Sequence, residues 1–281
     1  QAGKITDEGV VLWPARNKRV VFSPEDSIAL QMEMKSDMVV VLDDFTPPNA
    51  TRREAVETVR RTIDWARRSK EEFLKVCEEK KLSGSEKPYL LGVVQGGFYE
   101  DLRRFCAQEL VKIGFDGFGY GGWPVNNDGS FDYESARIIA EETPTDYLLY
   151  GLGVGKPDEV ANLVRMGYDI FDCVLPTRDA RHGRLYVFKA DSIEEIKIGR
   201  SLPAGRQAFW EYYIPSKGKN RDDDSPISKA CDCLLCTRYS RAYLAHLFRI
   251  GEMTAGRLAT IHNLRFYALL MEELRKEKGR V

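Results

Sequence analysis

The sequence predicts an α/β protein, a (βα)8 barrel of the TIM type followed by a smaller C-terminal subdomain. Short apolar runs alternate with longer amphipathic stretches, a pattern typical of parallel strands covered by helices. Polar or glycine residues end one apolar run after another, and a (βα)8 barrel carries its site at these strand ends. A doubly wound open sheet is the alternative, but no GxGxxG motif opens a first helix.

The positions of the elements follow from this alternation. The predicted strands are Met38–Leu42, Leu90–Val94, Gly117–Tyr120, Tyr147–Gly151 and Ile170–Leu175. The predicted helices between them are Arg52–Lys80, Tyr99–Ile113, Tyr133–Glu141 and Asp158–Arg165. After Asp179 the pattern changes to a hairpin strand at Arg184–Phe188, a polar loop at Ser216–Ser228, and helices at Ser240–Ile250 and Thr254–Lys278.

Composition excludes several classes of protein. The chain has 281 residues, of which 43% are apolar and 30% charged, and its net charge is -1. No overall basic field therefore attracts nucleic acid, so such binding needs a local patch. No signal peptide is visible in these residues, and no apolar run is long enough to cross a membrane. Scattered single cysteines fit a reducing cytoplasm better than a disulfide framework.

A cluster of metal-ligand residues lies near the C-terminus. Cys231, Cys233 and Cys236 fall in the run CDCLLC, and His262 follows after 25 intervening residues. Three thiolates and one imidazole complete a tetrahedral shell around zinc, with no position left for water, so a structural ion is expected. The alternative, three buried free thiols and an unrelated histidine, is the weaker one for so dense a cluster. We therefore expect a barrel over residues 1–200, a zinc-binding subdomain over 201–262 and a C-terminal helix over 263–281 that packs on the barrel.

Asp172 is the first candidate for a catalytic carboxylate. It stands at the end of an apolar run between Phe171 and Cys173, where partial desolvation is expected. A structural ion pair with Arg178 or Arg181 is the alternative role.

Asp43 and Gln95 are candidates for binding a planar heterocycle. A carboxylate at Asp43 can accept two N–H donors from a guanine-like base edge, and the amide of Gln95 can pair with the same base. Gly121 and Gly122 allow a flat ligand to approach the backbone, although a tight turn is the simpler explanation for these two glycines.

Several motifs together resemble the queuine tRNA-ribosyltransferases, the tRNA-guanine transglycosylases. They are SDMVVVLDD, LGVVQGG, GFDGFGYGG, GVGKPDE, FDCVLPTR and the CxCxxC cluster with its histidine, in this order from about Gly3 to Glu277. The resemblance implies a (βα)8 barrel enzyme of the cytoplasm, a homodimer, that replaces guanine at the wobble position of the tRNA anticodon loop. The incoming base is a 7-deazaguanine, either preQ1 or queuine.

The resemblance also implies roles for individual residues. Asp172 matches the nucleophile that holds the ribose covalently. Asp43, Gln95 and Gly122 match positions that recognise the base, and Leu152 stands under it. Arg178 and Arg181 match residues that contact the anticodon loop, while Cys231, Cys233, Cys236 and His262 match the ligands of the structural Zn2+.

The chain departs from the family pattern at its start. A further family aspartate, a proposed general acid/base, is expected to precede the segment KITDEGV, and so are the first barrel strands. The absent initiator Met agrees with a fragment, a processed form or an engineered start. Two alternatives to a tRNA enzyme therefore stay open: a DNA-directed deazapurine transglycosylase, and a non-catalytic RNA-binding partner subunit.

Overall fold

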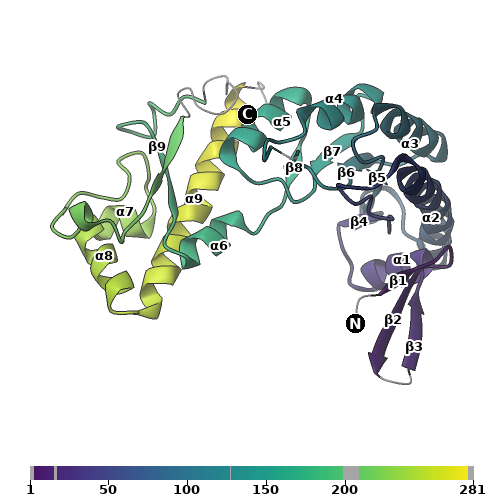
Figure 1. Ribbon diagram of the computed structural model, residues 1–281, viewed down its shortest axis with the longest axis horizontal. Helices are drawn as coiled ribbons and strands as arrows, with labels where there is room; N and C mark the ends of the chain where they lie inside the picture. The colour runs from purple at the N-terminus through teal and green to yellow at the C-terminus, as the bar shows by residue number, and fades with distance from the viewer. Residues whose placement is uncertain (1–2, 16–17, 127, 199–208, 278–281) are drawn as a thin grey trace. The chain divides into compact units, whose positions relative to one another are not determined.

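The computed structural model of the protein describes residues 3–15, 18–126, 128–198 and 209–277 (Figure 1). The chain divides into two compact units. The first comprises Gln1–Leu152 and Met166–Ile170, and the second comprises Gly153–Arg165 and Phe171–Val281.

The first unit begins with a small antiparallel sheet of order β1-β2-β3, which the sequence pattern did not predict. Its strands are Lys4–Ile5, Val10–Ala15 and Lys18–Phe22, and helix α1 (Pro24–Glu33) follows. A capping box between Ser23 and Asp26 begins this helix, because each side chain bonds the backbone N–H of the other. The indole of Trp65 donates to the carbonyl of Asp7 at 2.9 Å, which ties this sheet to α2.

The main sheet of this unit is parallel and curled into a half-barrel of order β4-β5-β6-β7-β8. Its strands are Met38–Val40, Tyr89–Val94, Gly117–Tyr120, Leu148–Gly151 and Ile170–Phe171. All residues of β6 and all but the first of β5 are buried. Gly117 has no room for a side chain, since a Cβ there would lie 2.5 Å from the carbonyl oxygen of Leu148.

Helices α2 (Arg52–Glu79), α3 (Glu100–Ile113) and α4 (Tyr133–Glu142) pack in sequence order beside this sheet, and a 3-10 turn, η1 (Gly84–Glu86), precedes β5 (Figure 1). Helix α2 begins at a capping box of Thr51 and Glu54. Its apolar face buries Trp65 and Phe73 completely, while its charged face stays exposed. This arrangement places the ends of β4, β5 and β6 next to one another.

In the second unit, several of the short elements pack on one long helix, α9 (Met253–Glu277) (Figure 1). Its other elements are α5 (Pro157–Met166), α6 (Leu175–Arg181), β9 (Leu185–Phe188), β10 (Trp210–Tyr213), η2 (Gly218–Asn220), α7 (Leu234–Arg238) and α8 (Arg241–Arg249). Strands β9 and β10 form an antiparallel pair. The core of the unit contains the three clustered cysteines together with buried leucines of β9, α7, α8 and α9.

The predicted fold class is confirmed as α/β, with a parallel half-barrel sheet and a C-terminal Cys3His group. The predicted strand at Ile170–Leu175 is too long. It ends at Phe171, and Leu175 already begins α6, because Pro176 suits the first turn of a helix. No helix among the described residues is both long and apolar enough to cross a bilayer.

Candidate functional site

Asp43 and Gln95 are brought together in the first unit. Asp43 lies just beyond β4, and Gln95 directly follows β5. The Gln95 amide donates to Oδ2 of Asp43 at 2.5 Å and accepts from the backbone N–H of Thr46 at 3.1 Å. Gln95 is fully buried, so these two bonds fix the direction of its amide. The pair presents a carboxylate held in one orientation at the edge of the sheet.

The two adjacent aspartates have different partners. Asp44 is buried and pairs with Arg61 of α2, whereas Asp43 bonds Gln95. Burial raises the pKa of Asp43, the hydrogen bond from Gln95 opposes that rise, and the nearby charge of Asp44 adds to it. Asp43 therefore has spare acceptor capacity in a poorly solvated place, where hydrogen bonds to a ligand are strong.

Gly121 and Gly122 follow β6 and approach the amide of Gln95. A Cβ at Gly121 would lie 2.6 Å from the carbonyl oxygen of Val94 and 2.7 Å from Nε2 of Gln95. Gly122 has φ of +90°, and a Cβ there would lie 3.3 Å from Oε1 of Gln95. Only glycine fits at these two positions, so the peptide groups of Gly121 and Gly122 can lie close to Gln95.

Leu152 lies beside β6 in the same unit. Its Cδ1 is 2.6 Å from the position that a Cβ of Gly119 would take, so the absence of a side chain at Gly119 makes room for it. The first unit therefore holds four of the predicted base-binding residues: Asp43, Gln95, Gly122 and Leu152.

Arg103 of α3 is a functional residue that the sequence reasoning missed. Its side chain is fully buried and donates to the carbonyls of Gly97 at 2.8 Å, Val94 at 3.1 Å and Gly121 at 3.0 Å. It thereby ties the ends of β5 and β6 together around Gln95. A signal existed, because Arg103 stands three residues before Cys106 and seven before Leu110, on the buried face of the helix.

Asp172 directly follows β8 and belongs to the second unit. Its Oδ1 accepts a hydrogen bond of 2.9 Å from the backbone N–H of Gly153. The carboxylate is exposed, so the expectation that its neighbours partly desolvate it is wrong for this structure. Arg178 and Arg181 lie exposed on α6, a few residues beyond Asp172.

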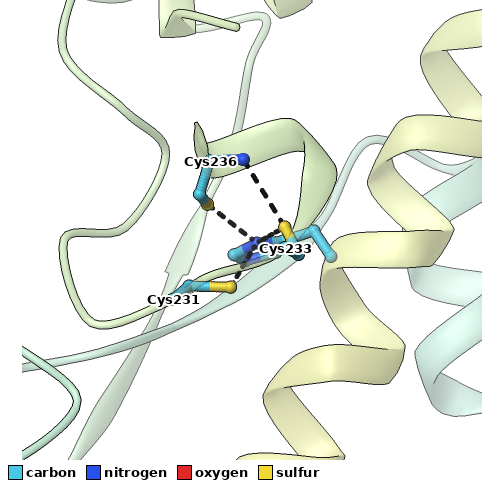
Figure 2. Close-up of side chains that lie close together, drawn as sticks. Cys231, Cys233 and Cys236 are labelled. Atoms are coloured by element: carbon cyan, nitrogen blue, oxygen red, sulfur yellow. Dashed lines mark hydrogen bonds between the residues drawn. The ribbon is translucent and has the colours of Figure 1, made fainter. Parts of the chain in front are cut away.

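Four residues of the second unit form a group able to bind a metal ion, and Figure 2 shows its three cysteines. Cys231, Cys233 and Cys236 surround His262 of α9, and all four ligand atoms lie within 4.8 Å of one another. The sulfurs are 3.6, 3.6 and 3.3 Å from Nδ1 of His262. Bonds from zinc to sulfur and to nitrogen, set at a tetrahedral angle, place these atoms about 3.5 Å apart. The residues present thus fit a tetrahedral ion.

The surroundings of this group also suit a metal. Nε2 of His262 lies 2.8 Å from the carbonyl oxygen of Tyr186, which leaves Nδ1 free to act as a ligand. Cys233 stands at the start of α7, where its sulfur accepts from the backbone N–H of Cys236 at 3.5 Å. Hydrogen bonds from Cys231 and Cys236 lower the pKa of Cys233, as expected where one thiolate is favoured in a crowded cluster.

Comparison with known proteins agrees with this arrangement. The family model for queuine tRNA-ribosyltransferase (TGT) matches residues 1–277. A curated queuine tRNA-ribosyltransferase of Shewanella baltica (strain OS155 / ATCC BAA-1091) is 40% identical over 274 residues, which cover 97% of this chain and 65% of that protein. One of Haemophilus influenzae (strain PittEE) is 38% identical over 274 residues, covering 97% of this chain and 64% of that protein.

The chain spans less than two thirds of the length of these relatives. The match nevertheless includes both units and the Cys3His group, since it extends over nearly the whole chain. The chain belongs to the queuine tRNA-ribosyltransferase family.

Proposed function

We propose that the protein is a tRNA-guanine transglycosylase, a pentosyltransferase that exchanges the wobble guanine of a tRNA anticodon for a 7-deazaguanine, preQ1 or queuine. Family membership supports the reaction class. The observation that carries the proposal is the hydrogen-bonded pair of Asp43 and Gln95, because its buried amide and half-buried carboxylate suit the edge of a guanine. Closure of the half-barrel into a (βα)8 barrel is part of the same proposal.

Base recognition follows from the chemistry of this pair. Asp43 accepts hydrogen bonds from the ring N–H and the exocyclic amino group of the base, which both guanine and a 7-deazaguanine carry. Gln95 and the peptide group at Gly122 recognise the neighbouring oxygen edge. Leu152 supports the flat face of the ring. Discrimination against adenine results, because adenine lacks the two adjacent donors.

Asp172 is the proposed nucleophile. Its carboxylate forms a bond to C1′ of the ribose while the bond from C1′ to N9 breaks, and the departing guanine keeps the electron pair and takes up a proton. The incoming 7-deazaguanine gives up its N9 proton and attacks C1′, which releases the Asp172 carboxylate. Two displacements give net retention at C1′, and the RNA backbone stays intact.

RNA and metal binding complete the proposal. Arg178 and Arg181 are exposed on the helix that follows Asp172, where guanidinium groups can contact phosphates of the anticodon loop. The target base leaves its stack to reach Asp43 and Gln95. Cys231, Cys233, Cys236 and His262 hold Zn2+, whose closed shell gives it a structural role. Homodimerisation and a cytoplasmic location rest on family membership.

The test is exchange of labelled guanine into tRNA by the full-length protein, with trapping of the covalent RNA adduct on a denaturing gel. Asp172→Asn should lower exchange by about a thousandfold or more and abolish the adduct. An Asp172→Asn protein that still trapped RNA would sink the assignment. Exchange into duplex DNA instead of tRNA would favour the DNA-directed enzyme, and tRNA binding without exchange would favour a non-catalytic subunit.

A further inference from the structure

Asn263, next to the metal-ligand residue His262 on α9, connects three backbone groups of the second unit. Its side chain is fully buried. Its Oδ1 accepts from the backbone N–H of Tyr186 at 3.1 Å. Its Nδ2 donates to the carbonyls of Pro176 at 2.9 Å and Arg184 at 3.0 Å. One amide thus fixes α6 and β9 to the helix that carries His262.

Tyr267 lies one helical turn further along α9 and reaches a second segment. Its hydroxyl donates to the carbonyl oxygen of Gly155 at 2.5 Å. Gly155 in turn packs against Cys173, since a Cβ at Gly155 would lie only 2.0 Å from the Cys173 sulfur. The same segment supplies the Gly153 N–H that bonds the Asp172 carboxylate. α9 therefore touches the chain on both sides of Asp172.

The metal-binding group joins the same network through Tyr186. The Tyr186 carbonyl lies 2.8 Å from Nε2 of His262, and its N–H is held by Asn263. Its hydroxyl donates to Oδ2 of Asp179 in α6 at 2.6 Å. Both Tyr186 and Asp179 are buried, so these bonds are shielded from water.

We propose that Asn263 and Tyr267 are positioning residues for Asp172, and that they link its placement to the metal-binding group. Their i and i+4 spacing puts both on one face of α9. Asn263 sets the start of α6, which follows Asp172, and Tyr267 sets the segment that bonds its carboxylate. A nucleophile must be placed to within a fraction of an ångström, so losing one of these bonds affects the reaction more than the fold. This inference rests on the proposed function.

The first test is independent of activity. Backbone hydrogen exchange is measured on the full-length protein with zinc bound and after chelation, in the peptides around Gly153 and Tyr186. Chelation should speed exchange at both amides. Tyr267→Phe should speed exchange at Gly153 alone with zinc still bound. Tyr213→Phe is the matched control, because its buried hydroxyl has no hydrogen-bond partner among the described residues and it lies in the same unit.

The second test separates positioning from folding. Tyr267→Phe should lower the single-turnover rate of adduct formation about 10- to 100-fold and leave the Kd for tRNA unchanged. Tyr213→Phe should leave both values unchanged. Asn263→Ser gives a second variant, with a shorter side chain that reaches fewer of the three groups.

The proposal is wrong if chelation speeds exchange only around Cys231–Cys236, or if Tyr267→Phe changes neither the exchange at Gly153 nor the rate. A wild-type protein that forms no adduct would instead contradict the proposed function. The hydrogen-exchange results would still decide whether α9 couples the metal group to the Asp172 segment.

Discussion

The backbone N–H of Gly153 donates a hydrogen bond of 2.9 Å to Oδ1 of Asp172. Gly153 adopts φ of +70°, a left-handed conformation, while the space around its missing Cβ is open. The direction of this N–H therefore depends on the backbone conformation and not on packing. The bond orients one carboxylate oxygen of Asp172.

Substitutions at Gly153 should separate conformation from size. Gly153→Asn should preserve stability to within about 0.5 kcal/mol, because asparagine tolerates positive φ. Gly153→Val should lower the free energy of unfolding by about 1–2 kcal/mol and slow adduct formation. Chemical denaturation and single-turnover assays measure the two effects. Equal behaviour of the two variants would show that φ at this position has no influence on Asp172.

Asp43→Asn should stabilise the protein at pH 7 and weaken base binding. The ordinary pKa of an aspartate is 3.8, and burial raises the pKa of Asp43 in the folded state. Well below pH 3.8 both the folded and the unfolded state hold this proton. As the pH rises through 3.8, the unfolded chain releases the proton first, so the free energy of unfolding falls until the pH passes the raised pKa of the folded state. The variant removes that loss, so its gain in Tm should be present at pH 7 and vanish at low pH.

Thermal scans across this pH range, together with guanine binding, check this prediction. Binding should weaken roughly 10- to 100-fold, since one partner of a buried hydrogen-bonded set is changed. Asp37→Asn is the matched control, because Asp37 is an exposed aspartate of the same unit. A gain in Tm that persisted unchanged at low pH would have to come from some source other than the charge of Asp43.

Zinc removal should loosen the second unit before it affects the base-binding residues of the first. Three thiolates without a cation repel one another, and the buried core around them depends on their placement. Cys236→Ser should abolish zinc binding and lower Tm, whereas Cys77→Ala, at a buried cysteine of α2, should retain about one ion per chain. Metal analysis measures the zinc content of each variant, and calorimetry measures its Tm. If zinc removal left Tm unchanged and abolished the exchange reaction, this would contradict a structural role for the ion.

Arg103→Lys should destabilise the first unit by about 1–3 kcal/mol and weaken guanine binding. An ammonium group cannot reproduce the planar fork that reaches the carbonyls of Val94, Gly97 and Gly121. Arg104→Lys is the adjacent control, since Arg104 forms surface ion pairs with Glu141 and Glu142. Its effect should stay below about 1 kcal/mol. Similar losses of stability in Arg103→Lys and Arg104→Lys would show that the buried guanidinium group contributes no more than a surface one.

Local patterns were sufficient for much of the fold. Strand β6 lies at Gly117–Tyr120, as predicted, and α2 starts at Arg52 behind the cap of Thr51, because apolar spacing and capping act within a few residues. The Cys3His group was likewise predictable from ligand spacing.

Other features depend on contacts between distant parts of the chain. Asn263 bonds Pro176, 87 residues away, and nothing near Asn263 in the sequence indicates this. Arg103 was missed because a buried arginine needs carbonyl partners that only the folded backbone assembles. The roles of Asp43, Asp172, Arg178 and Arg181 stay predictions, since they concern ligands and reaction steps.

Arg103 also has a consequence for how the protein responds to acid. Its hydrogen bonds to Val94, Gly97 and Gly121 end on backbone carbonyls, which do not titrate. The ends of β5 and β6 are therefore joined around Gln95 without a carboxylate. Acid sensitivity of base binding is then expected from Asp43 and its neighbour Asp44, since burial raises the pKa of both, or from the base itself.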